Sequence, residues 1–264
     1  MNHIRPPAVA GSFYPDNVNT LQKMIQELMH QVPQRQNSST KPKALIVPHA
    51  GYIYSGLTAA FGYHQLQQFK QDIKRVILLG PSHRVALYGM AVPSVDYFQT
   101  PLGDIQLDTS EINKLVQQGL VDFSDQAHQQ EHSLEVQLPF LQQVLDDFTL
   151  LPIVVGQSPY QVTSQLLESY INNSEDLVVI STDLSHFLTY QQAQERDQRT
   201  ANLIENLSLE QLTGHDACGV MPLTGMLQTC KAHDFNITQL DLRNSGDTAG
   251  DKQRVVGYGS WAVY

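Results

Sequence analysis

ALIVPHAGYIYSG, residues 44–56, begins with a short apolar run and passes through a proline directly into a histidine. Two later stretches have a similar form, VILLGPSH at residues 76–83 and LVVISTDLSH at residues 177–186. Short, continuous apolar runs bounded by Gly or Pro are typical of buried parallel strands. Open α/β sheets build their sites at the carboxyl ends of such strands, so the three runs predict an α/β fold with a reactive pocket.

The rest of the chain alternates in the same way between helical and strand patterns. The strand-helix-strand unit from residue 44 to residue 80 favours a parallel pair of neighbouring strands with a right-handed crossover. A chain of 264 residues fits one large domain, predicted over 1–264, with a central, mostly parallel or mixed sheet flanked by helices. Apolar spacing predicts helices over 17–32 (capped by Asp16), 57–69, 109–118, 159–173, 190–206 and from Pro222 to about 231, and strands over 149–155 and 254–264.

Composition narrows the class of protein. Apolar residues make up 41% and charged residues 16%, which is typical of a globular chain. The formal net charge of −10 would repel nucleic acid and anionic membranes. No apolar stretch reaches the roughly 18 to 20 residues of a membrane span, and the N-terminus does not resemble a secretory signal. The two cysteines, Cys218 and Cys230, suit a reducing cytosol. We therefore expect a cytoplasmic protein with neither a nucleic-acid nor a membrane partner.

His49, His83 and Cys218 are the candidate metal ligands. A histidine at the end of a strand is more often a hydrogen-bonding cap than a ligand. Here both histidines follow a proline within two residues and end predicted neighbouring strands, and imidazole suits Zn, Fe and Cu. Cys218 lies just before the helix predicted from Pro222, where the helix dipole favours a thiolate that could bind a metal or act as a nucleophile. The alternative for a cysteine is a small buried apolar residue, which fits Cys230 better.

Asp183 and His186 form a second candidate pair. Their spacing could place them on one turn, with the carboxylate orienting the imidazole for general acid–base work. Alternatively, Asp183 caps a helix and His186 is a surface residue.

The motif EHSLE, residues 131–135, does not indicate a single role for its residues. It resembles the zinc-protease motif HExxH only superficially, because it has one histidine. The roles of Glu131, His132 and Glu135 stay open, Ser133 is expected to cap a short helix, and His128 is expected to be a solvated loop residue.

At these residues the chain resembles the Memo family, known in prokaryotes as AmmeMemoRadiSam system protein B. The resemblance implies one α/β domain with a fold like the class III, non-haem-iron extradiol dioxygenases. The matching segments span nearly the whole chain: RPPAVAGSFYP (5–15), PHAGYIYSG (48–56), LGPSH (79–83), EHSLEVQLPF (131–140), STDLSHF (181–187), CGVMPL (218–223) and GDKQRVVGYGSWAV (250–263).

The resemblance also implies a metal pocket with His49, His83 and Cys218 as ligands, and with Asp183 and His186 close by. His186 matches the position of an acid–base histidine in the ring-cleaving enzymes. Those enzymes bind a divalent metal with two histidines and a carboxylate, and here Cys218 takes the place of the carboxylate. Because a thiolate is softer and easily oxidised, ring cleavage is not simply inherited. Fe(II) is favoured, with Cu or Zn as alternatives. The implied partners are a radical SAM enzyme and an AMMECR1-like protein.

Three functions follow from these residues. The first is a metal-dependent, dioxygenase-like redox enzyme, in which His186, Asp183 and Cys218 are catalytic. The second is a non-catalytic module that binds a peptide or small molecule in a pocket lined by Phe13, Tyr52 and Tyr54. The third is a hydrolase or transferase with Cys218 as the nucleophile and a histidine base. We rank the redox enzyme first, with Phe13, Tyr54 and His132 as its substrate-binding residues.

Overall fold

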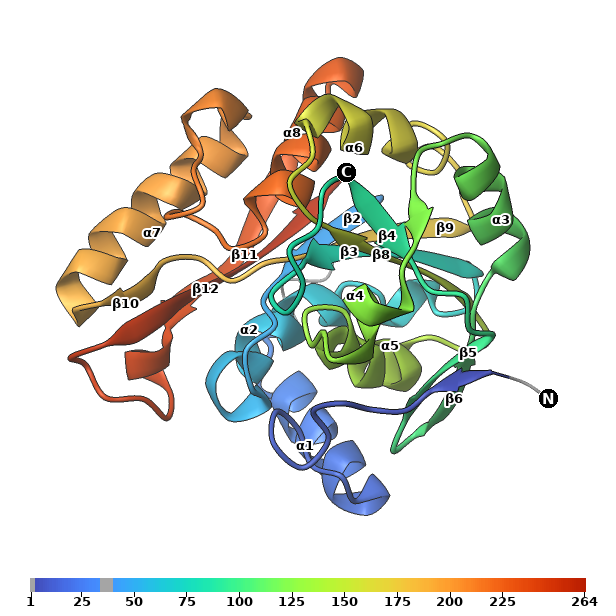
Figure 1. Cartoon of the computed structure of the whole chain (residues 1–264). Coiled ribbons are helices and arrows are strands. Elements are labelled where there is room, and N and C mark those ends of the chain that lie inside the picture. Colours follow the sequence, from blue (N-terminus) through green and yellow to red (C-terminus); the bar gives the residue numbers. More distant parts are fainter. Residues whose placement is uncertain (1–2, 34–39) are drawn as a thin grey trace.

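The protein is described here by a computed structural model that covers residues 3–33 and 40–264. Among those residues, nine strands form a mixed central sheet in the order β10-β12-β2-β9-β3-β8-β4-β7, with β11 paired to β12 (Figure 1). The four central strands run parallel: β2 (Ala44–Val47), β9 (Asp176–Ser181), β3 (Arg75–Pro81) and β8 (Thr149–Val155). The flanking strands are β4 (Met90–Val92), β7 (Asp122–Phe123), β10 (His186–Leu188), β11 (Ile237–Asn244) and β12 (Val255–Val263).

Helices cover both faces of this sheet. Figure 1 shows α1, α2 and α5 on one face and α6 and α8 on the other, and α7 packs against β11 and β12. The buried apolar side chains form a core cluster that extends from Val9 to Val263. The fold class predicted from the sequence, α/β with a mixed sheet flanked by helices, is therefore confirmed. The helices are α1 (Val18–His30), α2 (Tyr52–His64), α3 (Thr109–Gln117), α4 (Asp125–Gln129), α5 (Leu138–Val144), α6 (Tyr160–Leu167), α7 (Tyr190–Glu205) and α8 (Val220–His233).

The strand order corrects one prediction. β2 and β3 were expected to be neighbours, but β9 lies between them and pairs with both. The crossover through α2 therefore skips one position in the sheet, which a later segment of the chain fills. Sequential strands are adjacent only about two-thirds of the time, so the local pattern could not exclude this arrangement.

Several helix boundaries also differ from the sequence-based prediction. α2 begins at Tyr52 and not at residue 57, because Gly51 serves as its N-cap and the following residues are already helical. α6 ends at Leu167, well before residue 173. The N-cap of α1 is Asn17, whose side chain accepts the backbone N–H of Thr20 at 3.1 Å, in place of Asp16. α8 begins at Val220, two residues before Pro222.

A buried carboxylate fixes the N-terminal segment to the domain. Glu135 lies in the short 3-10 helix η3 (Glu135–Gln137), and its side chain is fully buried. It accepts hydrogen bonds from Arg5 Nη1 at 2.8 Å, from the backbone N–H groups of Ala8 and Val9 at 2.8 and 2.9 Å, and from the Tyr14 hydroxyl at 2.7 Å. Arg5 belongs to β1 (Ile4–Arg5), which forms a small second sheet with β5 (Tyr97–Thr100) and β6 (Gly103–Gln106). Glu135 therefore holds the segment from Arg5 to Tyr14 in place.

None of the helices in the described ranges has the length and the apolar character that a membrane span requires.

Truncation of Glu135 should strongly destabilise the fold. Glu135→Ala leaves Arg5 buried without its carboxylate, which costs about 3 to 5 kcal/mol in free energy of unfolding. The measurement is chemical denaturation of both proteins. Glu27→Ala is the control, because Glu27 pairs with Lys23 on the surface, where both side chains are largely exposed, and it should cost less than about 1 kcal/mol. Equal losses in the two variants would contradict this account.

Candidate metal centre

Three parallel strands deliver candidate side chains to one edge of the sheet. His49 follows β2 by two residues, His83 follows β3 by two and Asp183 follows β9 by two. His132 reaches the same edge from the segment between α4 and η3. His49, His83 and His132 each offer a ring nitrogen, and these atoms all lie within 4.8 Å of one another. The structure therefore brings together the three histidines, one of which the sequence had placed among the substrate-binding residues.

The tautomer of His49 follows from its hydrogen bonds. His49 is buried, and its Nδ1 lies 2.8 Å from Ser181 Oγ. The Ser181 hydroxyl donates its one hydrogen to the carbonyl of Ser133 at 2.6 Å and also accepts from Gln137 Nε2 at 2.8 Å. Ser181 can therefore only accept from His49, so the proton is on Nδ1 and Nε2 keeps a free lone pair. Burial lowers the pKa of His49 well below its ordinary value, so the ring is neutral near pH 7.

Glu131 orients the second histidine. Its carboxylate is almost fully buried and accepts His83 Nδ1 at 2.9 Å and the His83 backbone N–H at 2.6 Å. The backbone N–H groups of His132 and Ser133 add two more bonds, each of 2.9 Å. Burial opposes ionisation of this carboxyl, but the bonds from His83 and the backbone outweigh it and lower the pKa of Glu131 to about 2. Such a carboxylate–histidine pair leaves His83 Nε2 available to a metal.

His132 completes the cluster. Its ring stacks on that of His83, with centroids 4.7 Å apart, and lies 5.5 Å from that of His49. Its Nδ1 is buried and lies 3.3 Å from Glu131 Oε1, without a hydrogen bond of good geometry in the described part of the chain. Burial lowers the pKa of His132 to about 4, so this ring is also neutral near pH 7. A neutral imidazole beside two others fits a metal ligand. Phe13 packs on His132, with ring centroids 4.8 Å apart.

Cys218 lies beside His49, two residues before α8, and is not part of the group of three histidines. Its Sγ is 3.3 Å from His49 Nε2 and accepts the Asp183 backbone N–H at 3.3 Å. With metal–nitrogen and metal–sulfur bonds of about 2.0 and 2.3 Å, a separation of that size closes an angle of about 100° at a shared ion, near the tetrahedral value. The donor set therefore fits a divalent metal.

The protonation of Cys218 differs from the sequence-based prediction. We expected the start of α8 to favour a thiolate, but burial, together with the nearby Asp183 carboxylate, raises the pKa of Cys218 to about 12. The expectation is wrong for the uncoordinated side chain, because desolvation outweighs the helix dipole and the backbone hydrogen bonds. Cys230 is fully buried in the core, as its alternative interpretation predicted.

Asp183 and His186 do not form the expected hydrogen-bonded pair. The Asp183 carboxylate accepts the backbone N–H of His49 at 2.7 Å and so positions that residue, and burial raises the pKa of Asp183 to about 6. His186 is exposed at the start of β10, and its Nδ1 lies 2.8 Å from the carbonyl oxygen of Leu184. The catalytic roles predicted for both residues stay predictions.

Several other expectations are corrected. Tyr52 cannot line a pocket, because it is buried and its hydroxyl donates to the Val136 carbonyl at 2.7 Å, whereas Tyr54 is 36% exposed. His128 is not solvated: it is buried on α4, with Nε2 3.0 Å from the Ala91 carbonyl oxygen. Ser133 is not a helix cap, because its hydroxyl donates to the Pro81 carbonyl at 2.8 Å.

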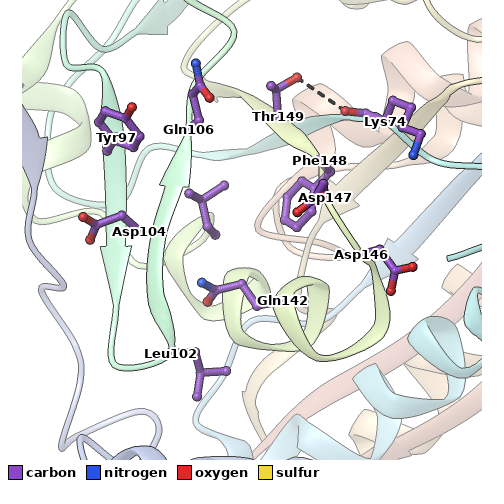
Figure 2. A pocket seen from close by; sticks show the side chains of 11 residues that line it. Lys74, Tyr97, Leu102, Asp104, Gln106, Gln142, Asp146, Asp147, Phe148 and Thr149 are labelled. Carbon is purple, nitrogen blue, oxygen red and sulfur yellow. Dashed lines mark hydrogen bonds between the residues drawn. The ribbon is translucent and has the colours of Figure 1, made fainter. Parts of the chain in front are cut away.

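A hollow of about 600 Å³ lies away from the histidines, between the β5–β6 hairpin and the segment that leads from α5 into β8 (Figure 2). Lys74 and Thr149 line it, and they mark the amino ends of β3 and β8. The histidines follow the carboxyl ends of their strands, so this hollow is at the opposite end of the sheet and does not contribute to the cluster.

Comparison with known proteins agrees with the sequence motifs. The family model described as Memo-like protein matches residues 5–262. The chain belongs to the Memo family. Among its Memo relatives, MEMO1 family proteins from Aquifex aeolicus and Metallosphaera sedula are each 36% identical to it, over 97% and 96% of this chain and 97% of each relative. The family predicted from the motifs is therefore confirmed.

A solved structure supports the fold of this Memo family chain. The uncharacterized protein JW3007 from Escherichia coli K12 superposes with a TM-score of 0.54, covering 83% of this chain and 98% of that one. Its sequence identity is 12%, so the likeness concerns the fold alone.

Proton release should reveal whether Cys218 binds the metal. The histidines His49 and His132 are neutral near pH 7 and have no proton to lose, whereas a coordinating Cys218 must lose its thiol proton. Titration calorimetry with Zn(II), in buffers of different ionisation enthalpy, should give about one proton released per ion. The apparent affinity should then rise with pH. Cys218→Ser should release close to none, and an unchanged proton count in this variant would show that the thiol is not a ligand.

Removing the charge of Glu131 should lower the affinity for the metal without abolishing metal binding. Glu131→Gln no longer holds His83 Nδ1–H with a carboxylate, and such a loss costs about 10- to 100-fold in metal affinity. The measurement is competition for Zn(II) against a chelator. Glu168→Gln is the matched control, because it alters another histidine–carboxylate contact, that with His233 at 2.7 Å, away from the cluster. Equal affinity for Zn(II) in the wild type and Glu131→Gln would contradict the proposed orienting role.

Proposed function

We propose that this chain is a metal-dependent redox enzyme of the dioxygenase-like type, with Fe(II) as the favoured ion and Cu or Zn as alternatives. The supporting observation is the convergence of His49, His83 and His132 within 4.8 Å at the carboxyl edge of the sheet. Both candidate ligand sets contain His49 and His83. The proton count above decides whether Cys218 or His132 is the third ligand. Imidazole donors with one soft thiol suit iron, copper and zinc.

The surrounding residues have separate tasks in this proposal. A bound Fe(II) ion would supply electron-transfer chemistry and open positions for a substrate and an oxidant. Asp183 holds the backbone of His49 in place, and Phe13, which packs on His132, would contact the substrate. His186 keeps Nδ1 on the Leu184 carbonyl, so its Nε2 is the atom that would accept or donate a proton. Tyr54 is partly exposed and would contact the substrate.

Two further parts of the proposal rest on the family and on composition. The family resemblance supports joint action with a radical SAM enzyme and an AMMECR1-like protein on a small-molecule or peptide substrate. Both cysteines are free thiols, which supports a reducing, cytoplasmic location.

Metal loading tests the proposal directly. Protein purified without oxygen and incubated with Fe(II) should retain about one ion per chain after desalting. His49→Ala and His83→Ala should each lose most of the ion, because the two ligands that remain of the three cannot hold it tightly. His233→Ala is the control, because His233 pairs with Glu168 away from the cluster. Retention of no iron by the wild type, or equal retention by all four proteins, would refute the metal site.

A further inference from the structure

An apolar hollow of about 270 Å³ adjoins Cys218. It lies between the loop that follows β3 and the first turn of α8, and the carboxyl ends of β3 and β8 contribute to its wall. None of the described residues that line it carries a charge. Its larger apolar side chains are Val85, Leu87, Tyr88, Val155, Val220 and Met221.

Two of the polar groups in its wall are already paired with backbone carbonyls of the same wall. The Ser82 hydroxyl donates to the Val85 carbonyl at 2.6 Å, and the backbone N–H of Gln157 donates to the Leu87 carbonyl at 2.8 Å. Gly156 permits this close contact, since a Cβ there would lie 2.1 Å from Leu87 O. Paired backbone groups offer little to a polar ligand, and apolar atoms contribute the larger share of the accessible lining.

Cys218 connects this hollow to the histidine cluster. The residue lines the hollow, and its Sγ lies 3.3 Å from His49 Nε2. A group resting in the hollow would therefore contact the side chain that faces the candidate metal ligands. The rim is formed by Tyr88, which is 79% exposed, and by Met221, which is 37% exposed. Met221 has a flexible side chain that can adjust to the shape of a ligand.

We propose that this hollow is a substrate subsite that binds an aromatic ring or a branched aliphatic group, while the reactive end of the same molecule reaches the metal centre. The proposal rests on the proposed function. A cavity of about 150 Å³ is enough for benzene, so this volume accommodates a ring with a short substituent. A phosphate or carboxylate is disfavoured in the hollow, because no described residue that lines it carries a compensating charge. Substrates whose apolar end carries such a charge should therefore be poor ones.

Fluorobenzene is a suitable probe because it is apolar and does not bind metals. In ¹⁹F NMR titrations of metal-free protein, it should bind with a dissociation constant on the order of 1 mM, as its few atoms allow. Val220→Trp fills the hollow and should weaken this binding by about tenfold or more. Ala86→Trp, at an exposed position on the same lining, is the second variant in case Val220→Trp does not fold. Val18→Trp on α1 is the matched control, because Val18 is 42% exposed and outside the hollow.

Metal loading then tests whether the hollow faces the centre. Bound Fe(II), which is paramagnetic, should broaden the ¹⁹F signal of bound fluorobenzene, and Zn(II) should not. If no ion binds but fluorobenzene binds and is blocked by the tryptophan variants, the proposed function fails and the apolar site stands. Binding that is equal in Val18→Trp and both hollow variants, no binding at all, or bound Fe(II) without broadening would each overturn the subsite.

Discussion

The candidate centre depends on one buried, ionised carboxylate, that of Glu131. Four N–H groups from three residues point at it: two from His83 and one each from His132 and Ser133. A carboxylate removed from water is stable only when it is paired in this way. The pairing therefore fixes the end of β3 against the segment that carries His132. If Glu131 were neutral, its bonds to His83 and to the His132 backbone would be weaker, and both histidines would be held less firmly.

The segment from Glu131 to Gln137 performs the same task for its other neighbours. Glu135 accepts hydrogen bonds from the N-terminal segment that carries Phe13. Ser133 and Gln137 both form hydrogen bonds with Ser181, which in turn fixes the His49 ring. Four polar side chains of this segment have a partner outside it, at the end of β3, at the end of β9 or in the N-terminal segment: Glu131, Ser133, Glu135 and Gln137. The ring orientations are consequently set before any ion or substrate arrives, which lowers the entropic cost of binding either one.

Electrostatics at the centre differ from those of the surface. The whole chain carries a formal charge of −10, yet burial keeps His49 and His132 neutral and Cys218 protonated. Neutral nitrogen donors bind a cation without first losing a proton. In the proposed arrangement, Cys218 lies between this polar centre and the apolar hollow. The same side chain would therefore contact both the metal and the substrate.

The sequence by itself determined the α/β class, the parallel strands and the placement of His49, His83 and Asp183 at strand ends, because apolar runs and breakers act through neighbours along the chain. Only the tertiary structure decided which strands are adjacent, that Tyr52 and His128 are buried, and which groups orient the histidines. Those facts depend on pairs far apart in sequence, 48 residues for His83 with Glu131 and 169 for His49 with Cys218. The protonation of Cys218 belongs with them, because it reflects the desolvation that the packed fold imposes and no local pattern encodes that quantity.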